Sequence, residues 1–203
     1  MKSSLPVRTF ASQAALAAWL AKNHDKSDGV WLKLAKKGAR TPSVTYAEAV
    51  EVALAWGWID GQKQALDDDW WLQKLTRRSA KSLWSKINRD KATALIAAKK
   101  MHPPGVAEVE RAKRDGRWDA AYDSPSSSKV PDDLRAALEG NARAAAFFAT
   151  IDATNRYAIL WRIQTAKKPE TRARRVGELV AMLARRELLH PERATRRPAK
   201  ASR

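Results

Sequence analysis

A change in the spacing of apolar residues near residue 85 constrains the fold of this 203-residue chain more than any other sequence feature. Before that point, apolar and polar residues alternate over 29–36, the pattern of a strand with one buried face. Residues 58–66 and 70–77 are predicted to be two further strands, joined by the turn Asp67-Asp68-Asp69. After residue 85, apolar residues recur every three or four positions, the pattern of amphipathic helices. We therefore predict an α+β fold: a small antiparallel sheet of three or four strands, beginning with a short strand at 7–10, followed by a helical module.

Capping residues mark where the helices begin. Ser12, Thr45 and Ser85 are of the type that accepts a hydrogen bond from the first helical turn, and Glu48 completes a capping box with Thr45. Pro169 suits the first turn of a helix, where its missing N–H costs no hydrogen bond. We predict helices after each of these residues, with one that ends at Gly116 and others at 131–138, 141–150, 152–168 and 169–187.

These patterns divide the chain into three segments. Residues 1–116 form the predicted α+β part, which contains most of the tryptophans. Residues 117–190 form the predicted helical module, entered through a loop at 123–131 that is rich in serine and proline. Residues 191–203 carry almost no apolar side chains, so we predict a disordered basic tail there.

Composition excludes several classes of site. The chain has no cysteine, so it holds no disulfide, thiolate zinc site, iron–sulfur cluster or cysteine nucleophile. Its three histidines, His24, His102 and His190, lack metal-ligand spacing, and we expect neither a metal nor a cofactor. No apolar signal-peptide core or membrane-spanning run occurs, so we expect a cytoplasmic protein that does not insert into membranes.

The balance of charge points to anionic partners. The chain has 39 Lys and Arg residues against 22 Asp and Glu residues, a net charge of +17. Such a field attracts small anions, acidic proteins or nucleic acid over long distances. A solvated basic surface without a specific partner explains the same composition.

Tryptophan is unusually frequent, with nine residues against three tyrosines and three phenylalanines. Five of them converge on the predicted sheet region because they fall within one short stretch: Trp56, Trp58, Trp70, Trp71 and Trp84. Tryptophan combines a large apolar ring with a single N–H donor. The cluster therefore forms either a packed core or the wall of a pocket for a flat ligand or a cation.

Two charged features lie beside these tryptophans. Asp60 shares a strand face with Trp58. We predict that it forms an ion pair with Arg77 or Arg78 of the next strand. The alternative is that Asp60 is a catalytic carboxyl. Residues 77–88 mix cations and hydroxyls just before a predicted helix N-terminus, which favours an anion site. An ordinary helix cap explains the hydroxyls equally well.

We predict that polar and aromatic residues of these segments converge on one pocket. Surplus arginines beside a helix N-terminus would select an anion, since a buried guanidinium needs a charged or polar partner. The competing interpretation is a closed network in which every arginine is paired internally. The candidate ligand-binding residues are Trp58, Asp60, Arg78, Ser82, Trp84, Ser85, Asn88, Arg117, Tyr122 and Arg156. Apart from the alternative role of Asp60, the sequence assigns no catalytic residue.

Several motifs follow one another in order between about residues 10 and 190. They are Gly29-Val30-Trp31-Leu32, Gly57-Trp58-Ile59-Asp60-Gly61-Gln62, Arg78-x-x-Lys81-Ser82-x-Trp84-Ser85-x-x-Asn88, Gly116-Arg117-Trp118, and the segment from Asn155-Arg156-Tyr157 to Pro169-Glu170-Thr171-Arg172. Through these motifs the chain resembles the YdeI/OmpD-associated proteins, a family also labelled bacteriocin-protection. The resemblance implies a YjbR/CyaY-like α+β layer in the first half and an OmdA-type helical module over roughly residues 118–176.

The resemblance also implies a role. The family is named for association with an outer-membrane porin and for tolerance of bacteriocins and cationic peptides. We therefore expect a cytoplasmic, stress-associated binding or adaptor protein with a Trp- and Arg-lined site for a small anion or an acidic partner. Weak, nonspecific nucleic-acid binding is the first alternative, and an enzyme of unknown chemistry that uses Asp60 is the second.

Overall fold

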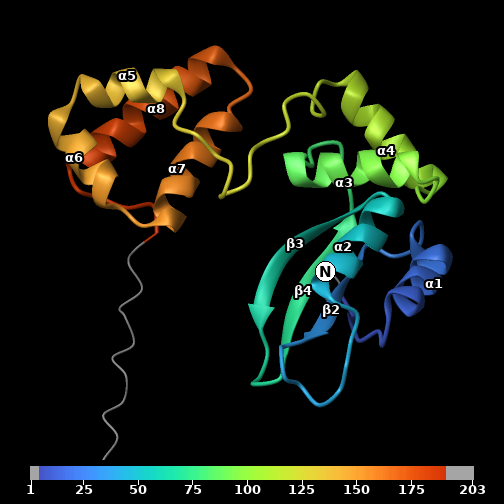
Figure 1. Cartoon of the computed structure of the whole chain (residues 1–203). Coiled ribbons are helices and arrows are strands. Elements are labelled where there is room, and N and C mark those ends of the chain that lie inside the picture. The colour runs from blue at the N-terminus through green and yellow to red at the C-terminus, as the bar shows by residue number, and fades with distance from the viewer. Residues whose placement is uncertain (1–4, 191–203) are drawn as a thin grey trace, which may run out of the picture. The chain divides into compact units, whose positions relative to one another are not determined.

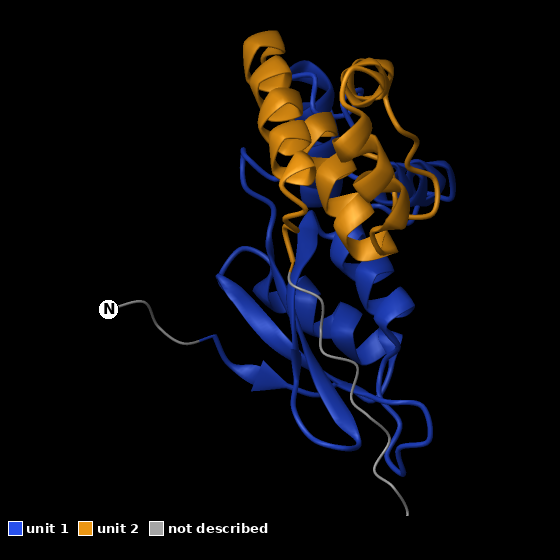
Figure 2. Cartoon of the chain, turned by 90° about the vertical axis from the view of Figure 1, so that its left-hand side faces the viewer, with its two compact units in different colours: residues 1–121 blue, residues 122–203 orange. Residues whose placement is uncertain are grey.

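The computed structural model describes residues 5–190, and the chain divides between Ala121 and Tyr122 into two compact units (Figure 2). Unit 1 is Met1–Ala121 and unit 2 is Tyr122–Arg203. The segment 191–203, which is predicted to be a disordered tail, lies outside the described residues.

Unit 1 contains a sheet and four helices, and the predicted α+β class is confirmed (Figure 1). The four strands lie in the order β1-β2-β4-β3. The last two strands form a hairpin around the turn that contains Asp67, Asp68 and Asp69. The elements are β1 (Val7–Arg8), α1 (Gln13–Asn23), β2 (Gly29–Ala35), α2 (Tyr46–Ala55), β3 (Trp58–Ala65), β4 (Trp70–Arg77), α3 (Lys86–Ala97) and α4 (Pro103–Arg114).

The sheet is mixed, which corrects the prediction of a wholly antiparallel one. β2 pairs with β4, and β4 with β3, in antiparallel register, as predicted. The two-residue strand β1 instead pairs in parallel with β2, with Val7 opposite Trp31. The physical reason is the connection: α1 carries the chain back along the sheet, so β2 starts at the same end as β1.

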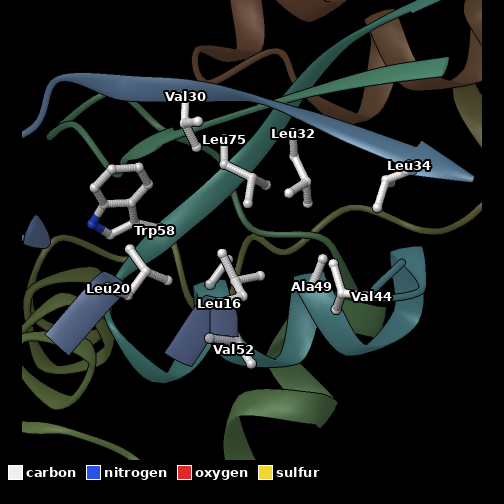
Figure 3. Packing of buried hydrophobic residues seen from close by; sticks show 11 residues of the cluster. Leu16, Leu20, Val30, Leu32, Leu34, Val44, Ala49, Val52, Trp58 and Leu75 are labelled. Atoms are coloured by element: carbon white, nitrogen blue, oxygen red, sulfur yellow. The ribbon is translucent and has the colours of Figure 1, made fainter. Parts of the chain in front are cut away.

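The core of unit 1 lies between one face of the sheet and the helices α1 and α2 (Figure 3). Leu16 and Leu20 of α1 pack against the alternate residues Val30, Leu32 and Leu34 of β2. These five side chains are 0–1% exposed. The alternation that predicted a half-buried strand therefore points its apolar residues at two helices.

The predicted N-caps are confirmed. Ser12 accepts a hydrogen bond from the Ala15 amide, and Ser85 accepts one from Asn88. Thr45 and Glu48 form the predicted capping box at the start of α2. Each cap joins residues three positions apart, so its geometry depends on local sequence alone.

A second apolar cluster joins α2 to the helices α3 and α4. Val50 and Leu54 of α2 contribute to it, together with Leu95 of α3 and Val109 of α4. α4 approaches α2 so closely that a Cβ on Gly105 would overlap the Ala55 carbonyl. The end of α2 is thereby fixed against the start of α4.

Unit 2 is helical, as predicted. It contains α5 (Asp132–Glu139), α6 (Ala142–Thr150), α7 (Ala153–Gln164) and α8 (Pro169–Ala184), which pack around their own apolar cluster. The last two helices end three or more residues before their predicted C-termini. None of the helices in residues 5–190 is both long enough and apolar enough to cross a membrane.

Candidate functional site

A pocket of about 350 Å³ opens in unit 1 where the ends of several elements meet. Small-molecule sites are concavities of roughly this size or larger, so the pocket can hold a small ligand. α1, α2, β4 and α4 or the residues beside them each contribute to its wall. The lining residues are His24, Asp25, Trp56, Gly57, Arg77, Arg78, Pro104 and Glu108.

Backbone contacts around Gly57 hold these elements together. Gly57 has φ +73°, a left-handed conformation that lets the chain turn directly from α2 into β3. Its carbonyl accepts a hydrogen bond of 3.0 Å from the Arg78 amide, just beyond the end of β4. A Cβ at Gly57 would lie 2.8 Å from the Pro104 carbonyl oxygen, so glycine also permits α4 to approach.

Trp56 supplies an aromatic wall. Its ring stacks on His102 with centroids 3.8 Å apart and an interplanar angle of 19°. His24 lies against the same tryptophan, with centroids 4.7 Å apart. The two imidazole contacts fix the orientation of the indole in the pocket wall.

Arg77 brings an accessible cation to the pocket. Its side chain is 48% exposed. Nη1 donates a hydrogen bond of 3.2 Å to the Asp25 carbonyl, and Nη2 donates one of 3.1 Å to Asp28 Oδ1. The Asp28 side chain is 89% exposed, so water screens this ion pair strongly.

Arg78 is only 5% exposed. Its guanidinium lies over the Trp84 ring, with Cζ 3.6 Å from the ring centroid, and Nη1 donates a hydrogen bond of 3.2 Å to the Leu83 carbonyl. Cation–π contact with a buried indole is among the strongest of its kind because water does not screen it. Trp84 therefore holds Arg78 at the edge of the pocket.

Glu108 places a carboxyl in the same pocket. Burial raises its pKa, while the nearby charges of Arg111, Arg78 and Arg117 act in the opposite direction. Arg111 also donates a hydrogen bond to Glu108. The net upward shift means that Glu108 takes up a proton at a higher pH than an exposed glutamate does.

A second arginine cluster lies beside Arg78. Arg117 is 6% exposed, donates from Nε and Nη2 to the Asp115 carboxylate, and donates from Nη1 to the Ser82 carbonyl at 2.7 Å. These hydrogen bonds lower the pKa of Asp115. The contacts bring Arg78, Ser82, Trp84 and Arg117, all predicted site residues, into one connected cluster, yet only Arg78 lines the pocket.

Trp58 and Asp60 lie in the core and on the sheet rather than in the pocket wall. Trp58 is 1% exposed, and its Nε1 donates a hydrogen bond of 3.2 Å to the His24 carbonyl. The sequence predicts an ion pair between Asp60 and an arginine of β4, but Asp60 accepts a hydrogen bond of 2.6 Å from the Tyr46 hydroxyl. The reason is register: Asp60 lies opposite Leu75, and Arg77 reaches Asp28 instead.

The remaining predicted residues have other local partners. Ser85 caps α3 through the Asn88 amide, so these two residues have the roles of an ordinary helix start. Tyr122 and Arg156 belong to unit 2, where Tyr122 packs edge-on against Trp161 and Arg156 lies over Phe148. Convergence of all the predicted residues on one site stays a prediction, because each unit is described by itself.

Sequence reasoning missed most of the pocket wall. Trp56 belongs to the tryptophan cluster described in the sequence analysis. Its position at the C-terminus of α2 is the one feature that indicates a place in the pocket wall. His24, Pro104 and Glu108 come from elements that local patterns cannot pair with the end of β4. Their contribution depends on the tertiary contact between α2 and α4.

Two family models match different parts of the chain. Residues 8–108 match a family described as a domain of unknown function (DUF8412). Residues 127–186 match the family described as Bacteriocin-protection, YdeI or OmpD-Associated. The searches of curated proteins and of solved structures found no match. The match over residues 127–186 supports the predicted resemblance of the helical unit to the Bacteriocin-protection, YdeI or OmpD-Associated (OmdA) family.

Proposed function

We propose that this protein binds a small anionic ligand in the pocket of unit 1. The observation that carries the proposal is the meeting of two guanidinium groups, Arg77 and Arg78, with the pre-positioned ring of Trp56 in one pocket of about 350 Å³. Guanidinium groups bind carboxylates and phosphates with directed, charge-assisted hydrogen bonds. An adjacent indole adds apolar contact to any flat part of the ligand.

The carboxyls in the pocket set the ligand's charge. Asp25 and Glu108 line the pocket together with Arg77 and Arg78, so the formal charges of the two carboxyls and the two guanidinium groups balance. Burial raises the pKa of Glu108, and protonation of this carboxyl removes the repulsion that it exerts on an anion. This balance favours a flat ligand with one anionic group over a polyanion.

Calorimetric titration of the full chain tests the proposal, with sulfate and adenosine monophosphate as the anionic probes and adenosine as the uncharged one. We expect saturable binding of both anions, tighter binding of the flat nucleotide, and no binding of adenosine. The variant Arg77→Gln removes the accessible cation and is expected to weaken binding by about tenfold or more.

The matched control is Arg114→Gln, which removes the same charge from an exposed position near the end of α4, outside the pocket wall. It is expected to bind like the wild type. Equal weakening in both variants would show that net charge, not the pocket, attracts the anions, and would overturn the proposal. Circular dichroism of both variants establishes that they are folded.

The family description supports a wider proposal about the role of the protein in the cell. We propose that the chain acts in the cytoplasm as a stress-associated binding or adaptor protein, and that ligand binding in unit 1 contributes to tolerance of bacteriocins or cationic peptides. Asp60 has no part in this proposal, because its hydrogen bond to Tyr46 lies outside the pocket wall.

A further inference from the structure

The face of the sheet that is turned away from α1 and α2 carries a group of aromatic and basic residues that is separate from the pocket. Residues of β2 that pack into the core alternate with those that point the opposite way. On this outward side lie Trp31 and Lys33 of β2, with Trp70 and Lys74 of β4. We refer to these four residues as the Trp–Lys face.

The four side chains form two pairs that cross between the strands. The Lys33 ammonium lies 4.5 Å from the centroid of the Trp70 ring. The Lys74 ammonium lies 5.9 Å from the centroid of the Trp31 ring. Each ring therefore has a lysine ammonium over it. Trp70 pairs with Ala35, four residues along β2 from Trp31, so the two tryptophans stand roughly 14 Å apart along the strands.

The charge of this face has one sign. Among the outward positions of β2 and β4 there are two lysines and no aspartate or glutamate. The nearest acidic run is the turn Asp67–Asp69, and the Asp67 carboxylate accepts hydrogen bonds from the Asp69 and Trp70 amides. That carboxylate is part of the hairpin turn and lies at one end of the face.

We propose that the Trp–Lys face binds single-stranded nucleic acid. Unpaired bases stack on exposed aromatic rings, and the phosphates between them pair with lysines. The face supplies both groups in alternation, with like charge throughout. A duplex keeps its bases inside the helix, so it engages the lysines and leaves the tryptophan rings without a stacking partner.

Fluorescence anisotropy of the full chain with a labelled oligothymidylate tests the proposal, and the matching duplex serves as competitor. We expect the single strand to bind more tightly than the duplex and to lose affinity as salt rises. The double variant Lys33→Gln/Lys74→Gln is expected to lower the slope of log affinity against log salt by about 1.4, because two phosphate contacts are lost. Trp31→Leu is expected to weaken binding about tenfold through lost stacking.

Two matched controls separate this surface from the overall charge. Lys81→Gln/Lys100→Gln removes two exposed lysines of unit 1 away from the sheet, and Trp161→Leu replaces a partly exposed tryptophan of unit 2. Both are expected to bind like the wild type. No detectable binding, a preference for duplex, or equal losses in variants and controls would each overturn the proposal. Displacement of the oligonucleotide by heparin but not by unlabelled single strand would assign the face to acidic glycans and would also overturn it.

Discussion

Arg77 and Arg78 are neighbours in the sequence and have different surroundings. Arg77 is half exposed and pairs with a carboxylate that water surrounds. Arg78 is buried against Trp84, so its removal leaves a hole beside a buried indole as well as removing a charge. For this reason a change at Arg77 reports on ligand binding, whereas a change at Arg78 also reports on the stability of unit 1.

Glu108 gives the pocket an expected dependence on pH. Burial raises its pKa, so on acidification from neutral pH Glu108 is neutralised at a higher pH than an exposed carboxyl is. Removing this negative charge strengthens anion binding, and we expect sulfate affinity to rise as the pH falls. Calorimetric titration with sulfate is suitable because sulfate keeps its charge while Glu108 takes up its proton.

The variant Glu108→Gln isolates that carboxyl from the other groups that face the pocket, His24, Asp25, Arg77 and Arg78. Glutamine keeps an acceptor for Arg111 and does not titrate. We expect the variant to bind sulfate more tightly at neutral pH and with a smaller pH dependence. An unchanged pH dependence would show that another of these groups is responsible.

At the scale of the elements, the contact between α2 and α4 positions the pocket. α4 carries both Pro104 and Glu108, and Gly105 between them lies against the last turn of α2. A side chain at this position would force α4 away from α2 and separate the two sides of the pocket wall. The conformation of Gly105 is helical, so its role is close approach rather than backbone freedom.

Two helical glycines allow a matched test of this contact. Gly105→Ala is expected to destabilise unit 1 by about 1–3 kcal/mol, because the added Cβ overlaps the Ala55 carbonyl. Gly177→Ala in α8 meets no atom within 4 Å and is expected to stabilise unit 2 by about 0.5–1 kcal/mol. Thermal unfolding by circular dichroism measures both changes. Stabilisation by both alanines would contradict the close contact of α4 with α2.

At the scale of the whole molecule, the net charge of +17 is shared by two units with separate cores. Only the helical unit carries the match to the OmdA family, whereas the pocket and the Trp–Lys face both belong to unit 1. The proposed cellular role therefore requires both units in one chain.

Complementation tests that requirement. A strain of the source organism without the gene is expected to survive bacteriocin or cationic-peptide treatment less well than the parent. The wild-type gene and Arg114→Gln are expected to restore survival, and Arg77→Gln is expected to restore it poorly because the pocket has lost its accessible cation. Full restoration of survival by Arg77→Gln, at a protein level equal to that of the wild type, would show that tolerance does not depend on anion binding in the pocket.

The sequence by itself determined the elements that depend on contacts within a few residues. Thr45 and Glu48 form a capping box across three positions, and the Ser85 side chain caps α3 across the same spacing. Both helix starts can therefore be predicted from the sequence. The alternation in β2 likewise predicts which side chains enter the core, because successive residues of a strand point to opposite faces.

Only the tertiary structure decided which distant residues meet. β1 pairs in parallel with β2, and Arg77 pairs with Asp28 rather than with Asp60. Glu108 and Trp56 line the same pocket. Each of these contacts joins residues that are far apart in the chain. Many such pairs of opposite charge or matching shape are compatible with one sequence. Close packing of α4 on α2 and the register of the sheet select among them, because a one-residue shift would turn every strand side chain to the other face.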